Sequence, residues 1–504
     1  MNPYIKTTLR DLGLLLHIPG AMAVISLPVC VIFGEYYALL SFLGTAAISF
    51  AIGQGLYRLF KKAEESRLPH ALLTVGLGWF LIPCLGSIPF ILIASHLSQT
   101  PLTPLTIFYF QNPWNALFEA FSGFTSTGLS VALHSSELPN ILLWWRSLME
   151  WIGGVGVIVL MISILEPSTD AYQLYSAETR NTKIGLTITE TVQKIWKIYL
   201  IYTAIAILLL RVAGMSWWHA INHGMTGIST GGFSIPDDSI AAYDTRIQAA
   251  VILVMIAGAI SFPVHYQLIY KGRLKALWQD SQHRALWILL VVGSLLLFFE
   301  TYWFHGQFHW LDSVFQWASA LGTCGFSTVN LKEWLTVEKL ILTVGMIFGG
   351  ASGSTVGGLK LTRVVSLFKA ILWRVQRVTL APHQMMYYKL DGKVISETQA
   401  NRRIESAAVL GALWLSAIAI SIFILINIVG PEYTLADVIF ESASALGSVG
   451  LSTGITGPTL PWLGKVILML LMWMGRLEIV PVLLLISWPL GRFKSQVSRR
   501  IRKL

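Results

Sequence analysis

The chain repeats one short phrase four times, and this repetition constrains its fold more than any other feature. Aligned on a shared glycine, each copy reads Ser or Thr, any residue, Gly, Leu or Phe, and then Ser. A hydroxyl-bearing residue stands six positions before each glycine and a small residue five before it. The copies are 124–130, 228–234, 321–327 and 446–452, with aligned glycines Gly128, Gly232, Gly325 and Gly450. Four copies of one loop can surround a common pseudo-fourfold axis.

The composition predicts an all-α integral membrane protein. Hydrophobic residues make up 54% of the 504 positions and charged residues only 12%, which is more apolar and less charged than a soluble protein. A membrane-spanning helix needs about 20 apolar residues. Ten such runs are found, near 12–33, 38–56, 71–95, 141–165, 196–215, 248–270, 285–304, 339–359, 406–429 and 463–488.

Each phrase falls on a connection between one span and the next, so the chain reads span, re-entrant loop, span four times. We therefore predict four membrane-pore-membrane repeats around a central ion pathway, preceded by two extra transmembrane helices. The predicted units are the extra pair at 1–66, repeats at 67–170, 171–272 and 273–370, and a fourth repeat with a basic tail at 371–504.

The distribution of basic residues predicts that both termini are cytoplasmic. With that orientation, 29 of the 36 Lys and Arg residues fall on inside segments, as expected for cytoplasmic loops. The net charge of +10 is then mainly an orientation signal, and the folded basic domain of a nucleic-acid-binding protein is absent. The basic loop 360–403 and the tail could hold anionic lipid or an acidic partner.

Cysteine usage suggests neither a disulfide framework nor a thiolate metal site. Cys30, Cys84 and Cys324 all lie in apolar or loop contexts, without the spacing of such sites. The first apolar run continues as a spanning segment, so we expect no cleavable signal peptide.

A short pore helix is expected before each phrase. Asn115, Asp312 and Asp437 stand at corresponding places, and Asn and Asp are good N-caps. About 12 Å of helix would then separate cap and phrase, with its partially negative C-terminal end favouring a cation near the midplane. The second copy departs from this pattern and has His219, Asn222 and His223 there.

The residue types in the phrases suit a cation filter built from backbone carbonyls. A dehydrated cation needs replacement oxygens, and glycine lets carbonyls turn inward without a side chain narrowing the passage. The preceding hydroxyl residues would add a second ring of oxygens or brace the loops. Small-residue packing between helices is the alternative, but four aligned copies on one side of the membrane favour the filter. The hydroxyl residues are Ser126, Thr230, Thr323 and Ser448.

The eighth span runs into GGASGSTVGGLK at 349–360, which interrupts a helix at membrane depth. Such a break is tolerated only beside protein or water, so we interpret it as an intramembrane gate beneath the filter rather than a kinked helix end. Its register does not fit a nucleotide-binding P-loop. The predicted gate residues are Gly349, Gly350, Ser352, Gly353, Ser354, Thr355, Gly357, Gly358 and Lys360.

Two charged pairs lie inside predicted spans. Arg476 and Glu478 interrupt the tenth span, where a charge costs about 2.5 to 3.5 kcal/mol on insertion scales. We expect Arg476 to act as an electrostatic barrier or latch of the gate, with a buried structural pair as the alternative. Arg146 and Glu150, four residues apart in the fourth span, are expected to pair with each other.

These motifs together resemble the Trk/Ktr/HKT superfamily of potassium transporters, most closely the Trk-type membrane subunit. The resemblance rests on the four phrases, on WRSLMEWIGGVGVIVL from Trp145, on FPVHY from Phe262, on GGASGSTVGGLK and on GRLE from Gly475. It covers nearly the whole chain from Leu68 onward. It implies a homodimer, commonly governed by a cytosolic nucleotide-binding ring that contacts inside loops.

The resemblance also implies roles for individual residues. It makes the segment 349–358 the gating loop and Arg476 the barrier, and Gly128 points to potassium rather than sodium. Potassium-coordinating carbonyls are implied at Ser126, Thr127, Gly128, Thr230, Gly231, Gly232, Thr323, Cys324, Gly325, Ser448, Val449 and Gly450, with K⁺ held chiefly at the first two positions of each set.

The sequence thus predicts potassium uptake across a bacterial inner membrane, driven by the membrane potential. Coupling to a proton or sodium ion stays open, and no cofactor is expected besides the transported ion. Outside, Glu137, Asp237 and Asp238 would concentrate cations. The alternative is a secondary transporter of sodium or ammonium. Such a transporter would have inverted repeats, whereas the four repeats here all have the same orientation. A membrane hydrolase using Ser352 or Ser354 lacks an orienting third group, so no enzyme activity is expected.

Overall fold

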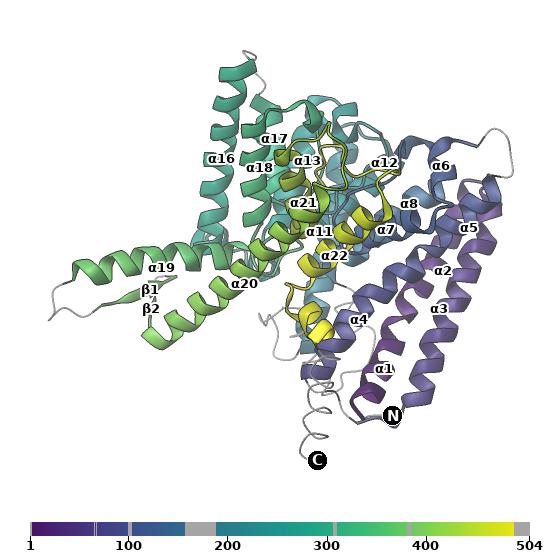
Figure 1. Ribbon diagram of the computed structural model, residues 1–504, viewed down its shortest axis with the longest axis horizontal. Helices are drawn as coiled ribbons and strands as arrows, with labels where there is room; N and C mark the ends of the chain where they lie inside the picture. The colour runs from purple at the N-terminus through teal and green to yellow at the C-terminus, as the bar shows by residue number, and fades with distance from the viewer. Residues whose placement is uncertain are drawn as a thin grey trace.

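The computed structural model describes residues 3–64, 66, 68–98, 103–156, 188–305, 310–380, 386–391 and 393–487. The described chain is helical almost throughout (Figure 1), which confirms the predicted all-α membrane class. One addition is a short antiparallel hairpin of β1 (Tyr388–Leu390) and β2 (Lys393–Ile395), in which Tyr388 pairs with Ile395.

The first three helices form a peripheral unit at one edge of the molecule (Figure 1). The helices α1 (Pro3–Leu15) and α2 (His17–Ile32) run on as one span, and α3 (Leu39–Phe60) returns beside both. Glycine permits a close approach of α1 and α3, because a Cβ on Gly53 would lie 2.8 Å from the carbonyl oxygen of Gly13. Close backbone contact at small residues is a common way to pack helices in a membrane.

Four helical groups of the same plan follow this unit. Each contains an outer helix, a short pore helix directly before a phrase, and a second helix after the phrase. The groups are α4 (Leu68–Gly86), α5 (Ile88–Leu97), α6 (Leu105–Tyr109), α7 (Pro113–Phe124) and α8 (Asn140–Val155); α11 (Ile188–Val212), α12 (Trp217–Ile228) and α13 (Thr245–Ala259); α16 (Ser281–His305), α17 (Trp310–Leu321) and α18 (Thr336–Phe348); and α20 (Glu397–Leu425), α21 (Leu435–Gly447) and α22 (Trp462–Arg476). The residue boundaries that the sequence suggests for these units stay a prediction.

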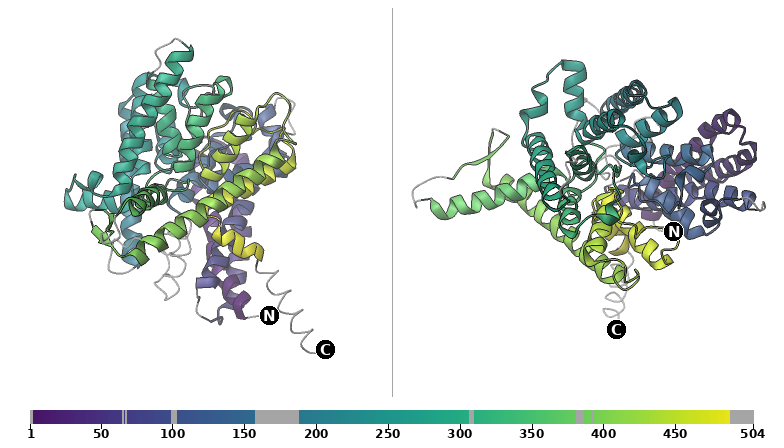
Figure 2. Two further views of the ribbon diagram at one scale, coloured as in Figure 1. Left: turned by 60° about the vertical axis from the view of Figure 1, so that its left-hand side comes forward. Right: turned by 90° about the horizontal axis from the view of Figure 1, so that it is seen from above.

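The second helices close the four groups into a ring. Each packs against its own pore helix and against the pore helix of the next group. Thus α8 contacts α7 and α12, α13 contacts α12 and α17, α18 contacts α17 and α21, and α22 contacts α21 and α7. Seen from above, the groups follow one another around the centre of the molecule (Figure 2).

The second helices are shorter than the continuous spans that the sequence predicts. Among the described residues, six helical segments are long and apolar enough to cross a membrane, or eight if two bent pairs count as spans. One bend, of 104°, separates α13 from α14 (Phe262–Lys271), and another, of 117°, follows α22. Residues with positive φ stand at three of the four ends: Gly156 after α8, Gly349 after α18 and Glu478 after α22. Six of the ten predicted spans are therefore continuous helices, whereas the four that follow the phrases are broken.

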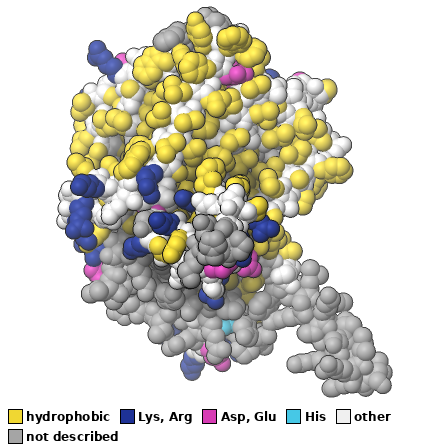
Figure 3. All heavy atoms as spheres, turned by 90° about the vertical axis from the view of Figure 1, so that its left-hand side faces the viewer, with side chains coloured by type: hydrophobic (Ala, Val, Ile, Leu, Met, Phe, Trp, Pro, Cys, Tyr) yellow, Lys and Arg dark blue, Asp and Glu magenta, His cyan; other side chains and the backbone are white. Residues whose placement is uncertain are grey.

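The surface agrees with a membrane protein. Hydrophobic side chains cover a broad band in Figure 3, and most Lys and Arg side chains in this view gather below it. An arm made of α19 (Leu361–Thr379), the hairpin and the first part of α20 projects sideways at that level (Figure 1). Most of 166–197 and the basic tail, on which the orientation prediction partly depends, lie outside the described residues.

Candidate functional site

The four phrases meet at the centre of the ring. A Cβ added to each aligned glycine would collide with a carbonyl oxygen of the neighbouring phrase. The pairs run in chain order and close on themselves: Gly128 lies against Gly231, Gly232 against Cys324, Gly325 against Val449, and Gly450 against Thr127. Segments that are far apart in the sequence therefore surround one axis at one level.

All four pore helices end in the same capping motif. In α7, the N–H of Thr127 donates to the Ser122 carbonyl (2.9 Å) and the N–H of Ser126 to the Gly123 carbonyl (2.9 Å). The same two bonds close α12, α17 and α21. This pair is the Schellman motif, which places the residue after the helix in the left-handed region. The backbone carbonyls of the two positions that lie six and five before each aligned glycine thus close the pore helix in all four copies.

The N-caps predicted for the pore helices are wrong. Asn112, not Asn115, caps α7 by accepting from the Trp114 N–H (3.0 Å). Thr434 caps α21, and Asp437 bonds back to the Thr434 N–H (2.8 Å) as the third residue of a capping box. Asp312 lies inside α17, where it accepts from the Thr328 hydroxyl (2.7 Å). An acidic residue at the third position of a helix is also favoured, because its side chain can accept from the N–H of the capping residue.

The backbone of each phrase alternates in conformation. The hydroxyl residues have φ between 43° and 55°, and the aligned glycines between 84° and 97°. Positive φ costs a non-glycine residue roughly 1 to 2 kcal/mol, so the same strain occurs once in each loop. The strained residues are Ser126, Thr230, Thr323 and Ser448.

Twelve backbone carbonyl oxygens of the phrases have no protein partner in the part of the chain that the structure describes. Among the described residues, none donates a hydrogen bond to the backbone carbonyls of the twelve residues for which carbonyl coordination is expected. The seven of them that are not glycine are at most 3% exposed. Buried carbonyls are nearly always paired, because leaving one unpaired costs free energy. These oxygens therefore need a partner that is not protein.

A polar cavity of about 470 Å³ opens on the outer side of the ring. All four aligned glycines and the serines two positions after them line it, together with Asp237 and Asp238. Asp237 also joins the loops of two groups, because it accepts from the Ser136 N–H and hydroxyl (2.9 Å each). Glu137 does not line this cavity, and its carboxylate accepts from the Thr106 N–H (3.4 Å).

In three of the four phrases, the side chain nine positions before the aligned glycine binds the C-terminal end of the phrase. Glu119 accepts from the Ser130 hydroxyl (2.8 Å) and the Val131 N–H (2.9 Å). Glu441 accepts from the Ser452 hydroxyl (2.8 Å) and the Thr453 N–H (3.2 Å), and Gln316 donates to the Ser327 hydroxyl (2.9 Å). These bonds tie the last serine of each phrase to its own pore helix. His223 stands at the second copy, where Ser234 instead donates to the Pro236 carbonyl (2.9 Å).

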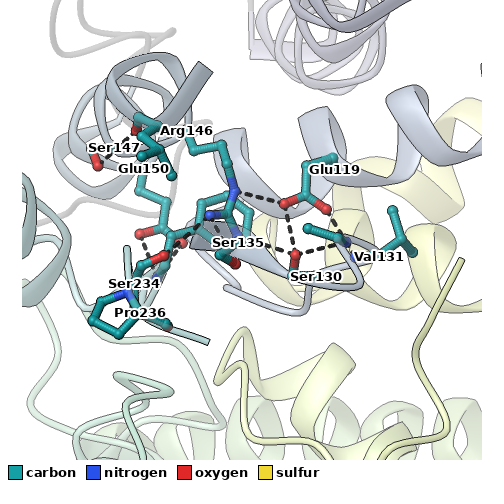
Figure 4. A network of polar contacts seen from close by, with 12 residues as sticks. Glu119, Ser130, Val131, Ser135, Arg146, Ser147, Glu150, Ser234 and Pro236 are labelled. Atoms are coloured by element: carbon teal, nitrogen blue, oxygen red, sulfur yellow. Dashed lines mark hydrogen bonds and ion pairs between the residues drawn. The ribbon is translucent and has the colours of Figure 1, made fainter. Parts of the chain in front are cut away.

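Arg146 pairs with Glu119 and not with Glu150, which corrects the sequence prediction. Its Nε lies 2.8 Å from Glu119, and both side chains are buried. Its other nitrogens donate to the Ser130 hydroxyl (3.1 Å) and the Ser234 carbonyl (3.2 Å) (Figure 4). The guanidinium thus joins the first phrase, which contains Ser130, to the second, which contains Ser234. Glu119, its ion-pair partner, lies on the pore helix α7.

Glu150 has a different place, behind the second loop. Its carboxylate oxygens accept from the Phe233 N–H (3.1 and 3.2 Å), and a Cβ on Gly231 would collide with its side chain. Sequence reasoning missed this role, since nothing in the spacing along one helix indicates a contact with the next repeat.

The glycine-rich segment after α18 lies directly beneath three of the four phrases. The Thr355 hydroxyl contacts that of Thr230 (3.3 Å) and donates to the Gly258 carbonyl (3.0 Å). The Gly357 N–H donates to the Thr323 hydroxyl (2.9 Å), and the Gly358 N–H to the Gly447 carbonyl (3.0 Å). The loop from Gly349 to Lys360 therefore stands across the inner side of the ring.

Arg476 and Glu478 fix this inner side. The Arg476 guanidinium donates to the carbonyls of Gly153 and Gly154 at the end of α8. Glu478 pairs with Lys360 (2.8 Å) and with Arg363, at the two sides of the junction between the glycine-rich loop and α19. Arg476 thus connects the fourth group with the first, and Glu478 connects it with the glycine-rich loop and α19.

The family is decided by a match over most of the chain. The family model of TrkH, described as a cation transport protein, matches residues 40–495. This chain belongs to the TrkH family. Its glycine-rich loop and its four phrases all fall within the matched range.

Relatives and a solved structure extend this match to nearly the full length. An uncharacterized cation transporter of Methanocaldococcus jannaschii is 29% identical over 489 residues, covering 96% of this chain and 97% of that protein. The Trk system potassium uptake protein TrkH of Halomonas elongata is 29% identical over 507 residues, covering 96% and 98%. The crystal structure of the potassium transporter TrkH from Vibrio parahaemolyticus matches with a TM-score of 0.80 at 24% identity, covering 95% of this chain and 98% of that one. The last match shows a shared fold.

Proposed function

We propose that this TrkH-family protein takes up potassium through the ring of four phrases. The observation that carries the proposal is the set of twelve converging carbonyls without a protein partner among the described residues. Carbonyl rings replace the hydration shell of a monovalent cation. The ion at this place is the transported substrate, and potassium is supported by relatives that are named potassium uptake proteins.

The passage would begin in the outer cavity, where Asp237 and Asp238 raise the local concentration of cations. The ion loses water at the phrases and then meets the glycine-rich loop, which acts as the gate, with Arg476 as its latch. Uptake is driven by the membrane potential, which is worth about 2.3 kcal/mol per charge for 100 mV. Coupling to a proton or sodium ion would add to this driving force.

We further propose that the protein lies in a bacterial inner membrane as a homodimer with a cytosolic regulatory subunit. The relatives are named as proteins of a Trk system, and this name supports the presence of further components. The basic arm of α19, β1, β2 and α20 offers a surface on the cytoplasmic side. Co-purification of a nucleotide-binding protein with the full chain, lost when the hairpin is deleted, tests this part.

The decisive experiment is ion flux into liposomes that contain the purified protein. Potassium, rubidium, sodium and ammonium are compared under an imposed membrane potential. We expect potassium and rubidium to enter at least tenfold faster than sodium and ammonium. Preferred entry of sodium or ammonium would contradict the proposal and favour a transporter of those ions.

A further inference from the structure

A second cavity, of about 870 Å³, lies outside the ring, and none of the phrase residues lines it. It lies between α2 and α3 of the peripheral unit on one side and α8, α11 and α12 of the first two groups on the other. Its depth follows from the helix rise: the lining stretch of α2 from His17 to Ile25 covers about 12 Å, and that of α3 from Phe50 to Tyr57 about 10 Å. These lengths are close to one leaflet of a bilayer whose hydrocarbon core is about 30 Å thick.

The cavity is lined almost entirely by apolar side chains. Three tryptophans, Trp144, Trp151 and Trp196, form much of its inner wall. Ile25, at 59% exposed, stands at its border, so the cavity opens toward the surface that faces the bilayer. Large apolar cavities stay dry and hold apolar molecules. The bilayer supplies hydrocarbon chains at this level.

Polar and basic groups occur at one end of the cavity. Gln54 and Tyr57 line it there, and the Gln54 amide can accept from the Arg58 Nε at 2.8 Å. Arg58, Lys61 and Lys62 are exposed at the end of α3. This end lies beside the start of α1, because the Thr7 hydroxyl donates to the Glu64 carbonyl (3.1 Å). The cationic end thus faces the side of the membrane where the chain begins.

One buried donor in the cavity wall is unpaired. The indole N–H of Trp196 has no hydrogen-bond partner among the described residues, and the side chain is only 9% exposed. The indole nitrogens of its neighbours are paired, with Trp144 donating to Ser26 (3.1 Å) and Trp151 to Thr203 (3.0 Å). The Trp196 nitrogen is itself covered by protein atoms, so the proposal below does not depend on it.

We propose that this cavity binds one anionic phospholipid of the leaflet on the N-terminal side. An acyl chain fills the apolar part, and the phosphate lies at Arg58 and Tyr57. A basic residue near the membrane surface attracts anionic lipid. The lipid would also touch Trp151 and Ile152, directly before the carbonyls that Arg476 binds.

The test is native mass spectrometry of the full-length protein released from vesicles of equal parts phosphatidylglycerol and phosphatidylethanolamine. Ala21, which lines the cavity, is replaced in Ala21→Trp to fill it, and Ala47→Trp is the matched control on an exposed position of α3 that does not line it. We expect one retained phosphatidylglycerol per wild-type chain, at least tenfold less in Ala21→Trp, and no change in Ala47→Trp. Arg58→Gln should keep a lipid but lose the preference for phosphatidylglycerol.

Equal retention in Ala21→Trp and wild type, or equal retention of the two lipids by wild type, would overturn the proposal. A second measurement does not depend on the folding of a variant. Phosphatidylglycerol with a photoreactive group in its acyl chain is irradiated with the wild-type protein, and crosslinks should map to α2, α8 and α11. Crosslinks elsewhere only, or cavity residues protected by a second copy of the chain without lipid, would also overturn it.

Discussion

At the residue scale, strain and function coincide at the four hydroxyl residues. A glycine would adopt their left-handed conformation at lower cost, yet the chain has Ser126, Thr230, Thr323 and Ser448. Two of their hydroxyls bind neighbouring loops: Ser126 donates to the Ser229 carbonyl (2.9 Å), and Thr323 accepts from the Gly357 N–H. Strained residues persist where the surroundings hold them and concentrate at functional sites. Here the side chains brace one loop against the next.

Gly128→Ser should weaken the discrimination of potassium from sodium. The glycine has φ of 85°, and an added Cβ collides with the Gly231 carbonyl, so the two loops must move apart. A loss of about 1.4 kcal/mol of discrimination lowers the selectivity about tenfold. Competition of sodium with rubidium uptake in liposomes measures it. Gly44→Ser, at a site where a Cβ meets no neighbour within 4 Å, is the control, and unchanged selectivity in Gly128→Ser would argue against the filter.

Glu119→Ala should strongly destabilise the protein. The change leaves Arg146 buried at 2% exposure without its carboxylate, and removal of one partner of a buried pair costs about 3 to 5 kcal/mol. Thermal unfolding in detergent should show a clearly lower midpoint. The exposed pair Arg377–Glu397 gives the control Arg377→Ala, for which about 1 kcal/mol or less is expected. A midpoint equal to that of this control would contradict the structural role of the pair.

Sequence reasoning locates the phrases but not the partners of buried charges. The phrases are found because the same backbone conformation demands the same residues four times. Spacing along one helix is visible in a sequence, so the sequence predicts a pair of Arg146 and Glu150. Its actual partner, Glu119, is on another helix, and only the tertiary packing brings the two together.

At the element scale, the positions at which the second helices end are the feature that the sequence shows least. Their ends beneath the ring leave room for the glycine-rich loop, which was recognisable from its composition. The ends of α8, α13 and α22 involve single residues such as Gly156 and Glu478. A hydropathy window cannot detect them, since the apolar run continues through each break.

Arg476→Ala should raise ion flux at least severalfold. The guanidinium holds the end of α22 to the carbonyls of Gly153 and Gly154, and its charge repels a cation on the inner side of the ring. Removing it loosens the latch and lowers the electrostatic barrier. Rubidium uptake into liposomes measures the effect. Arg476→Lys, which keeps the charge but not both hydrogen bonds, should lie between wild type and alanine.

An Arg476→Ala protein that elutes as a normal folded species but transports at the wild-type rate would contradict the latch. A reduced flux with an unchanged thermal midpoint would contradict it as well, because it would make the arginine a support of the open pathway.

At the scale of the whole molecule, cyclic contacts make one chain equivalent to a four-subunit assembly. The contact between α22 and α7 closes the ring, and the peripheral α1 to α3 stand outside it. This architecture was predictable because each repeat has the same order of outer span, phrase and second span. The helix and hairpin of the sideways arm are not predicted, since the basic residues of 360–403 indicate an inside loop but not its structure.

The proposed orientation places the arm inside the cell and the cavity above the phrases outside it. Thr379, near the end of α19, and Asn330, in the lining of the outer cavity, are both exposed. In a Cys84→Ser background the remaining cysteines, Cys30 and Cys324, are buried. A membrane-impermeant maleimide should label Asn330→Cys in intact cells and Thr379→Cys only after permeabilisation. Because the positive-inside rule places basic segments in the cytoplasm, labelling of Thr379→Cys in intact cells would invert the molecule and direct the proposed uptake outward.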